Sequence, residues 1–169
     1  DSDTLFLAPI DSLFQCNEDV TAAGDGCFLR GLARDRDTLA ETARGPGRLN
    51  HTFNAGVMLF GPNALTGSDF NAALAELSVQ RFTRLECGLH DQAIYNLIFA
   101  ERAKHVDWRY NYLLKHRALI ERAEPVAPRN IRVLHFNQRL KPWKLSPEKV
   151  ATYQDPFRRW ATAQWFAAA

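Results

Sequence analysis

The sequence predicts an α/β domain, because short apolar runs that are typical of strands alternate with segments that have helical periodicity. Phe53–Phe60 is continuously apolar after Gly56, as a strand covered on both faces should be. Two segments with apolar residues at helical spacing follow it, from Ser68 or Asp69 to about Val79 and from about His90 to Arg102. With 169 residues, the chain is long enough for one domain with a sizeable core.

The other expected elements are short. We expect a helical turn at Ile10–Phe14, one or two extended pieces within Val20–Phe28, and strands at Thr4–Leu7, Val106–Trp108 and Ile131–Phe136. The highly charged Arg30–Asn50 contains Gly45-Pro46-Gly47 and predicts a surface loop that can include a turn of helix. Pro147–Tyr153 and Pro156–Phe166 predict C-terminal helices. We expect residues 1–169 to form a single domain in which 146–169 is a helical tail.

Composition and charge argue against several functional classes. The chain is 46% hydrophobic and 24% charged, and its formal net charge of +2 gives no concentrated basic face for nucleic acid. Its cysteines, Cys16, Cys27 and Cys87, are odd in number and lack C-x-x-C spacing, which argues against a disulfide framework or a structural zinc site. No apolar run approaches the length of about 18 residues that spans a membrane, and no signal peptide is evident. We therefore expect a cytoplasmic protein.

Asp1 and Asp3 are the first candidate site residues. Side chains two residues apart on an extended segment lie on one side and can share a cation. His135 can add an imidazole, and this donor set favours Mn²⁺ over Ca²⁺ and slightly over Mg²⁺. Three protein ligands would leave positions open for two phosphate oxygens and a water. The alternatives are a solvated turn for the acidic pair and a core histidine at a strand end.

Lys141 is a candidate for binding phosphate. It is followed by Pro142, which stiffens the segment, and by Trp143, which can anchor it. A lysine held in this way can place its charge on a departing diphosphate. The alternative is a surface lysine beside a packed tryptophan.

Two further segments are candidates for the sugar side of a site. Asn54 offers a donor and an acceptor to a sugar hydroxyl, and Gly56 indicates close approach of the backbone to a ligand. Asp91 and Gln92 open a helix and can place a carboxylate and an amide beside a reacting carbon. The alternatives are a bulge at a strand start and an acid that complements the helix dipole.

Taken together, these motifs resemble family 8 glycosyltransferases, a retaining group. The resemblance covers roughly Asp1–Trp143, in matching order and spacing. It is carried by D-S-D-T-L-F-L-A-P-I-D-S-L-F at Asp1–Phe14, F-N-A-G-V-M-L-F at Phe53–Phe60, D-Q-A-I-Y-N at Asp91–Asn96 and H-F-N-Q-R-L-K-P-W at His135–Trp143.

The resemblance implies the C-terminal portion of a GT-A fold, Rossmann-like with a mixed sheet, together with a UDP-sugar donor and Mn²⁺ (or Mg²⁺). It implies transfer of a hexose to a hydroxyl of a glycan, a lipid-linked glycan or a protein. By motif match, the metal ligands would be Asp1, Asp3 and His135. Lys141 would bind the diphosphate, and Asn54, Asp91 and Gln92 would line the sugar and acceptor side.

The sequence also departs from the family pattern. Gln138 stands where the family often has glycine, and Gly88 stands where some members carry an acid. The nucleotide-binding part that precedes D-x-D in the family is absent, so we expect the chain to be a piece of a larger protein and to bind UDP poorly by itself.

Two other functions stay open at this point. One is a non-catalytic carbohydrate- or partner-binding relic of the same fold. The other is a metal-dependent phosphoryl transferase or hydrolase, for which the sequence offers neither a Gly-rich phosphate loop nor a second acidic cluster. The apolar face of the tail Asp155–Ala169 predicts packing on its own domain, with peripheral membrane contact as the alternative.

Overall fold

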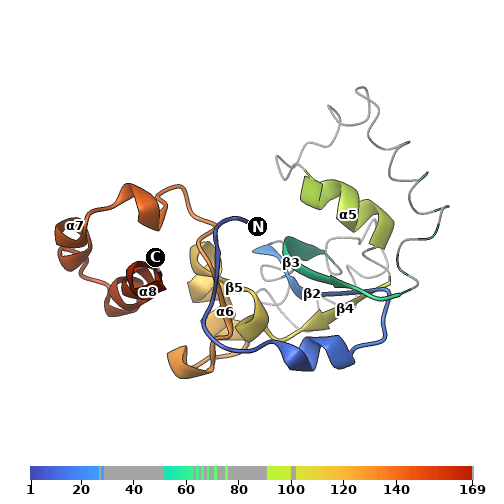
Figure 1. Cartoon of the computed structure of the whole chain (residues 1–169), viewed down its shortest axis with the longest axis horizontal. Coiled ribbons are helices and arrows are strands. Elements are labelled where there is room, and N and C mark those ends of the chain that lie inside the picture. The colour runs from blue at the N-terminus through green and yellow to red at the C-terminus, as the bar shows by residue number, and fades with distance from the viewer. Residues whose placement is uncertain are drawn as a thin grey trace.

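The computed structural model describes residues 1–26, 28, 52–62, 64, 66, 68, 71, 75, 91–99 and 102–168. Within this part of the chain, strands and helices form two three-stranded mixed sheets with helices around them (Figure 1). The α/β architecture predicted from the sequence is therefore confirmed. The predicted helix after Phe60 lies largely outside the described residues, and the predicted loop at Arg30–Asn50 lies wholly outside them.

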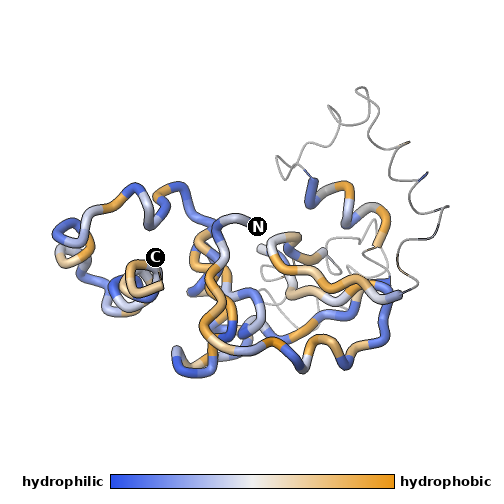
Figure 2. The backbone as a smooth tube through the Cα atoms, viewed as in Figure 1, coloured by the Kyte–Doolittle hydropathy of each residue, from blue (hydrophilic) through white to orange (hydrophobic). Residues whose placement is uncertain are grey.

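The larger sheet has the strand order β3-β2-β4. Its central strand β2 (Val20–Gly24) pairs antiparallel with β3 (Phe53–Phe60) and parallel with β4 (Ala103–Val106). Helix α5 (Asp91–Phe99) packs beside β3, and apolar side chains from these elements form one core. Figure 2 shows hydrophobic residues along both elements. The fully buried members of this core are Val20, Ala22, Phe53 and Phe99.

The smaller sheet has the strand order β1-β6-β5. Strand β6 (Val133–His135) lies at its centre, antiparallel to β1 (Thr4–Phe6) and parallel to β5 (Tyr112–Leu113). Every residue of β5 and β6 is buried. The larger hydrophobic core surrounds this sheet and includes Trp108, Tyr112, Leu134 and Phe136.

Short helices connect and cover the sheets. The 3-10 helices are η1 (Asp11–Gln15), η3 (Trp108–Tyr110), η4 (Leu114–His116), η5 (Pro128–Asn130) and η6 (Pro142–Lys144). The α-helices after α5 are α6 (Arg117–Ala123), α7 (Pro147–Ala151) and α8 (Pro156–Ala168). No described helix is long and apolar enough to cross a bilayer.

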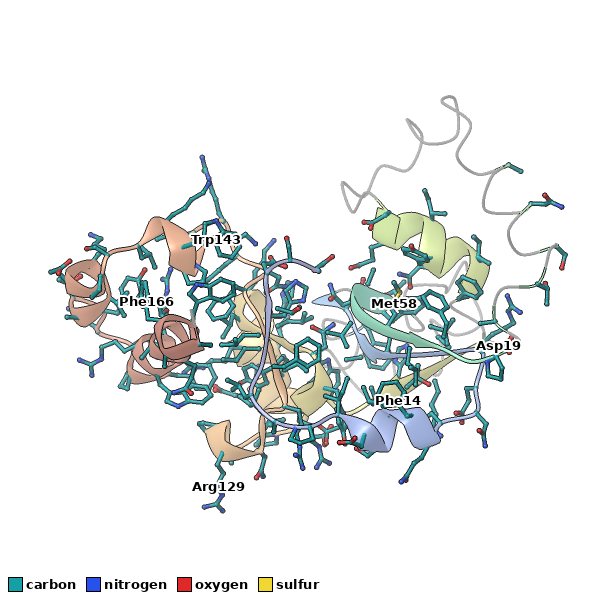
Figure 3. All side chains as sticks on the ribbon, in the orientation of Figure 1. Phe14, Asp19, Met58, Arg129, Trp143 and Phe166 are labelled. Atoms are coloured by element: carbon teal, nitrogen blue, oxygen red, sulfur yellow. The ribbon has the colours of Figure 1, made fainter. Side chains whose placement is uncertain are left out.

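Helix α8 begins at a side-chain cap and packs on the larger core. The carboxylate of Asp155 accepts hydrogen bonds from the backbone N–H groups of Phe157 and Arg158, at 3.0 and 3.3 Å. Phe157, Trp160 and Trp165 contact the core, and Ala161 is fully buried. Figure 3 shows Trp143 and Phe166 at the end of the molecule that α7 and α8 form. The apolar face of α8 therefore packs on its own domain.

Several predicted boundaries were wrong in informative ways. The strand expected at Val106–Trp108 ends at Val106, because Asp107 caps η3 by accepting a hydrogen bond from the backbone N–H of Arg109 at 2.7 Å. The strand β3 was found, but only Phe53 and Gly56 in it are buried, so it is not covered along both faces. Strand β5 and helix α6 were not predicted.

Candidate metal and substrate site

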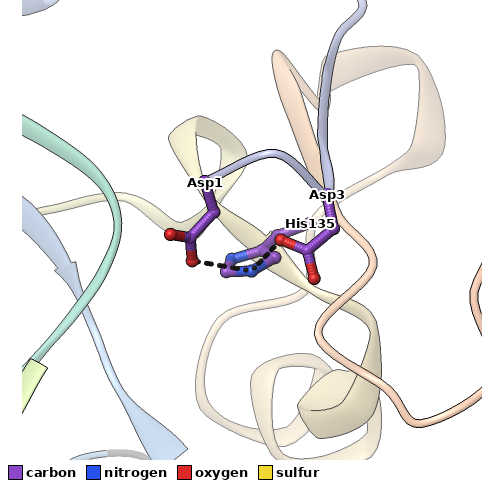
Figure 4. Close-up of side chains that lie close together, drawn as sticks. All are labelled: Asp1, Asp3 and His135. Carbon is purple, nitrogen blue, oxygen red and sulfur yellow. Dashed lines mark ion pairs between the residues drawn. The ribbon is translucent and has the colours of Figure 1, made fainter. Parts of the chain in front are cut away.

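The carboxylates of Asp1 and Asp3 and the imidazole of His135 lie close together, where the start of the chain runs beside the end of β6. Nε2 of His135 lies 3.2 Å from Oδ1 of Asp3 and 3.5 Å from Oδ2 of Asp1. One ligand atom from each residue lies within 4.8 Å of the others. Figure 4 shows both carboxylates directed at the imidazole ring. The structure therefore brings together the three residues that the sequence predicted to be metal ligands.

Strand pairing explains how residues so distant in sequence meet. Thr4 is the register partner of His135 across the β1–β6 ladder. The backbone N–H of Phe136 donates to the carbonyl oxygen of Asp3 at 2.8 Å and extends this ladder by one bond. The acidic segment is therefore held beside the end of β6 by backbone bonds, and side-chain geometry follows from the register.

His135 is buried and oriented from both sides of its ring. Its side chain is 3% exposed, and Nδ1 lies 2.9 Å from Oδ1 of Asn111. Burial lowers the pKa of His135 to about 4, although the negative charge of Asp3 opposes the shift. The imidazole is therefore neutral at pH 7, which is the state in which histidine binds a metal ion.

Asp3 is shared between the acidic cluster and Lys141. The ammonium group of Lys141 donates to Oδ2 of Asp3 and, at 2.7 Å, to the carbonyl oxygen of Phe136. Burial tends to raise the pKa of Asp3, but the hydrogen bond from Lys141, together with the electrostatic effects of His135 and Lys141, outweighs burial and holds this pKa below its ordinary value. The cluster and the predicted phosphate-binding lysine thus form one site.

Gly56 lies against the imidazole of His135. A Cβ atom at this position would lie 2.5 Å from Nδ1 of His135 and 2.8 Å from Oδ1 of Asn54. The sequence predicted that the backbone here approaches a ligand closely. In the structure, the group that requires a glycine is the side chain of His135.

Asn54 and Gln92 also lie in this region, joined by a hydrogen bond. The amide nitrogen of Asn54 donates to Oε1 of Gln92 at 2.8 Å, and Oε1 also accepts from the backbone N–H of Ala55 at 3.2 Å. Nε2 of Gln92 donates to the carboxylate of Asp25 at 3.1 Å. Gln92 is buried, and both ends of its amide bond to the protein. Asp91, the first residue of α5, is exposed.

A family model for "Glycosyl transferase family 8" matches residues 1–146. The chain belongs to glycosyl transferase family 8. A search among curated proteins found no significant match. Among solved structures, the chain is similar to the apo structure of the WbbM bifunctional glycosyltransferase, with a TM-score of 0.58 and 15% identity. The alignment covers 96% of this chain and 33% of that one, so the chain spans about a third of the length of this similar structure.

The structural similarity confirms the GT-A type of fold that the family resemblance implied. The family model ends at residue 146, which is also where the expected C-terminal helical tail of this family 8 chain begins. The helices α7 and α8 therefore lie beyond the matched region, although α8 packs on its core.

Sequence reasoning missed three polar residues that support the site of this family 8 chain. Asn111 bridges His135 and Asn54, Asp25 accepts from Gln92, and Asn96 bonds both backbone polar groups of Phe53, at 2.8 and 2.9 Å. Asp25 directly follows β2, and a polar residue at a strand end could have been noticed. Asn111 carries no such signal, because its role depends on contacts between distant segments.

Proposed function

We propose that this chain carries the metal- and diphosphate-binding part of a retaining glycosyltransferase that moves a hexose from a UDP-sugar to an acceptor hydroxyl. The observation that carries the proposal is the convergence of Asp1, Asp3, His135 and Lys141 at one point. Two carboxylates and a neutral imidazole suit a divalent ion such as Mn²⁺, with Mg²⁺ as a second choice. The adjoining cation suits a diphosphate.

The donor set fits a metal ion on chemical grounds. His135 turns Nε2 toward Asp1 and Asp3, while Nδ1 faces a protein acceptor. Two carboxylates facing an imidazole lone pair repel it, and a cation between them would relieve this repulsion. A bound divalent ion would neutralise charge on a leaving nucleoside diphosphate.

Among the described residues, Lys141 has two hydrogen-bond acceptors, which leaves one of its donors for substrate. Its ammonium group has three N–H bonds, of which one is directed at Asp3 and one at Phe136. The third can bond a phosphate oxygen without breaking the other two. We propose that Lys141 holds the diphosphate in this way and stabilises its charge as the sugar departs.

We propose different roles for the residues on the sugar side. Asp91 is exposed and can contact an acceptor directly. Gln92, expected from the sequence to lie beside the reacting carbon, is engaged with Asn54 and Asp25 and would act by orienting them. Asn54 keeps one N–H of its amide group for a sugar hydroxyl. Gly56 leaves room for His135.

The acceptor in this proposal is a hydroxyl of a glycan, a lipid-linked glycan or a protein. We also propose that the protein acts in the cytoplasm. Retention would follow from attack on the face of the sugar from which the diphosphate departs. In this proposal the carboxylate of Asp91 faces the acceptor and the amide of Asn54 faces the sugar, while Gln92 orients Asn54. These assignments rest on the family to which the chain belongs and on the arrangement of its polar side chains.

The test is transfer from a panel of UDP-sugars by the full-length protein, with and without Mn²⁺. We expect activity to depend on the ion and to fall by at least about a hundredfold in Asp3→Ala and His135→Ala, since removing a charge-stabilising group costs that much. Asp11→Ala is the matched control, because Asp11 is an exposed acid outside the cluster. Unchanged activity in both site variants would exclude the metal assignment. Tight sugar binding without transfer would favour the non-catalytic relic.

A further inference from the structure

Asn111 occupies a buried position between the candidate metal site and the sugar side. Only 1% of its surface is exposed. Its Oδ1 lies 2.9 Å from Nδ1 of His135, and its Nδ2 donates to Oδ1 of Asn54 at 2.8 Å. A buried side chain whose amide bonds at both ends has a single orientation available to it.

Two backbone N–H groups decide that orientation. A backbone N–H can only donate, and the N–H of Gly56 donates to Oδ1 of Asn54 at 2.9 Å. The N–H of Ala55 likewise donates to Oε1 of Gln92, so Asn54 must present its nitrogen to Gln92 and its oxygen to Asn111. Asn111 must then turn its nitrogen toward Asn54. Its oxygen is left facing His135.

An amide oxygen can only accept, so the nitrogen of His135 that faces it must carry the hydrogen. The ring hydrogen therefore sits on Nδ1, and the lone pair sits on Nε2. Nε2 is the atom that lies 3.2 Å from Asp3 and 3.5 Å from Asp1. The hydrogen bonds that begin at the backbone N–H groups of Ala55 and Gly56 thus direct the lone pair of Nε2 of His135 toward the two carboxylates.

We propose that Asn111 is a positioning residue that holds His135 in the Nδ1–H tautomer with Nε2 free to bind a divalent cation. The inference rests on the proposed function, because it concerns the same metal site. Partners that hold the second nitrogen of a metal-binding histidine fix both its tautomer and its ring orientation. Asn111 also ties the imidazole to Asn54, so the metal side and the sugar side share one polar network.

The tautomer can be measured without metal, sugar or activity. Long-range ¹H–¹⁵N correlation spectra distinguish the two ring nitrogens of a neutral histidine, and the His135 signals are assigned by their loss in His135→Gln. We expect the folded, metal-free chain to show hydrogen on Nδ1. A signal for hydrogen on Nε2 would overturn the proposal, whether or not the protein transfers sugar.

Two substitutions separate positioning from packing. Asn111→Asp keeps an acceptor for Nδ1–H but loses the bond that Asn111 donates to Oδ1 of Asn54. It should therefore retain the tautomer and bind Mn²⁺ more tightly than Asn111→Leu does, as measured by calorimetry. Asn111→Leu removes the acceptor and should lose the tautomer preference and weaken Mn²⁺ binding about 10- to 100-fold. Equal Mn²⁺ affinity in Asn111→Leu and the wild type would contradict the proposal.

Asn96→Leu is the matched control. Asn96 bonds Phe53 and Gln92 rather than His135, so its loss should reduce stability without changing the His135 tautomer. If Asn111→Leu does not fold, the wild-type tautomer and Asn111→Asp still decide the question. If His135 carries its hydrogen on Nδ1 but the full-length protein transfers no sugar, the proposed function is refuted and the role of Asn111 still holds.

Discussion

Lys141 donates a hydrogen bond to the carboxylate of Asp3 across 138 residues of sequence, and this ion pair joins the two halves of the candidate site. Oδ1 of Asp3 faces His135, and Oδ2 faces the ammonium group. The carboxylate can therefore bind a metal ion through one oxygen while the lysine stays on the other. Lys141 stabilises Asp3, but its charge also opposes a nearby cation.

Replacing Lys141 should therefore affect metal and diphosphate in opposite directions. In Lys141→Met, we expect Mn²⁺ affinity to stay the same or to rise severalfold, because a positive charge near the cation is gone. Affinity for UDP in the presence of Mn²⁺ should fall at least about tenfold, or about 1.4 kcal/mol. Calorimetric titrations of the ion alone, and of UDP at saturating ion, measure the two effects separately.

Lys144→Met is the control for this change. Lys144 ends η6, the 3-10 helix that Lys141 precedes, but it is exposed, and no hydrogen bond or ion pair of its ammonium group is found among the described residues. Its loss should leave both affinities within about twofold, because exposed charges are screened by solvent and salt. The proposed role of Lys141 is wrong if Lys141→Met weakens Mn²⁺ as strongly as Asp3→Ala does and leaves UDP affinity unchanged.

Gly56→Ala should displace His135. The added Cβ would lie 2.5 Å from Nδ1 of His135, so the ring must shift from the position in which Nε2 faces the carboxylates. We expect a loss of about 1–3 kcal/mol in stability, as for other overpacked sites, together with weaker Mn²⁺ binding. Urea unfolding measures the first effect and calorimetry the second.

Gly61→Ala is a matched comparison, because its Cβ would also be crowded, but by the backbone of Glu18 and not by a residue of the site. It should destabilise the chain and leave Mn²⁺ affinity unchanged. If both glycine variants weaken Mn²⁺ equally after correction for the unfolded fraction, the effect of Gly56 is general destabilisation and not displacement of His135.

Sequence reasoning found the elements that carry a local signal of their own. The run Phe53–Phe60 is apolar enough to be recognised alone, and α7 and α8 each begin at a proline, Pro147 and Pro156. Strand β5 has only two residues, so no periodicity could reveal it. Its place in the sheet depends on parallel pairing with β6, which is a tertiary contact.

The site likewise contains residues that the sequence indicated and residues that it did not. Asp1, Asp3, His135 and Lys141 were found because their residue types suit a metal and a diphosphate, and the structure brings them together. Asp25 could have been noticed as a polar residue at the end of β2, but its partner Gln92 could not be inferred, and the role of Asn111 depends wholly on contacts between distant segments. For Gly56, the sequence predicted a close approach of the backbone to a ligand, and the neighbour that the structure shows there is the side chain of His135.

Tyr112 should make the folded chain sensitive to alkaline pH. Its side chain is fully buried, and its hydroxyl has no hydrogen-bond partner among the described residues. Burial raises its pKa to about 12 from an ordinary value of 10.0. Between these two pKa values, the unfolded chain releases the proton of this hydroxyl while the folded chain keeps it. The contribution of Tyr112 to stability is therefore fully present below the unfolded pKa. Between the two pKa values, the free energy of unfolding falls by about 1.4 kcal/mol for each pH unit.

Tyr112→Phe should remove this dependence and cost little at neutral pH, because no hydrogen bond is lost. Urea unfolding at neutral pH and at about one unit above the ordinary tyrosine pKa gives the comparison. Tyr110→Phe is the control, since the Tyr110 hydroxyl pairs with Ser12 at the surface and should leave the alkaline slope unchanged. If the free energy of unfolding fell equally with pH in Tyr112→Phe and in the wild type, Tyr112 would not stay protonated in the folded chain.

Helix α8 should stabilise the strand that carries His135. Trp165 packs edge-on against Phe136, with ring centroids 5.5 Å apart, and also contacts Trp143 at 5.1 Å. Phe136 directly follows His135, so loss of this contact loosens the end of β6. We expect Trp165→Ala to lower stability by roughly 2–4 kcal/mol and the exposed Phe166→Ala by less than about 1 kcal/mol, measured by urea unfolding.

The same pair of variants tests the membrane alternative for the tail. If α8 serves the core, Trp165→Ala lowers stability and liposome co-sedimentation stays as in the wild type. A helix that lies on a bilayer would use the exposed aromatic side chain instead, so Phe166→Ala would reduce co-sedimentation while stability stayed unchanged. Because Trp165 contacts the core and Phe166 is partly exposed at the molecular surface, we expect the first result.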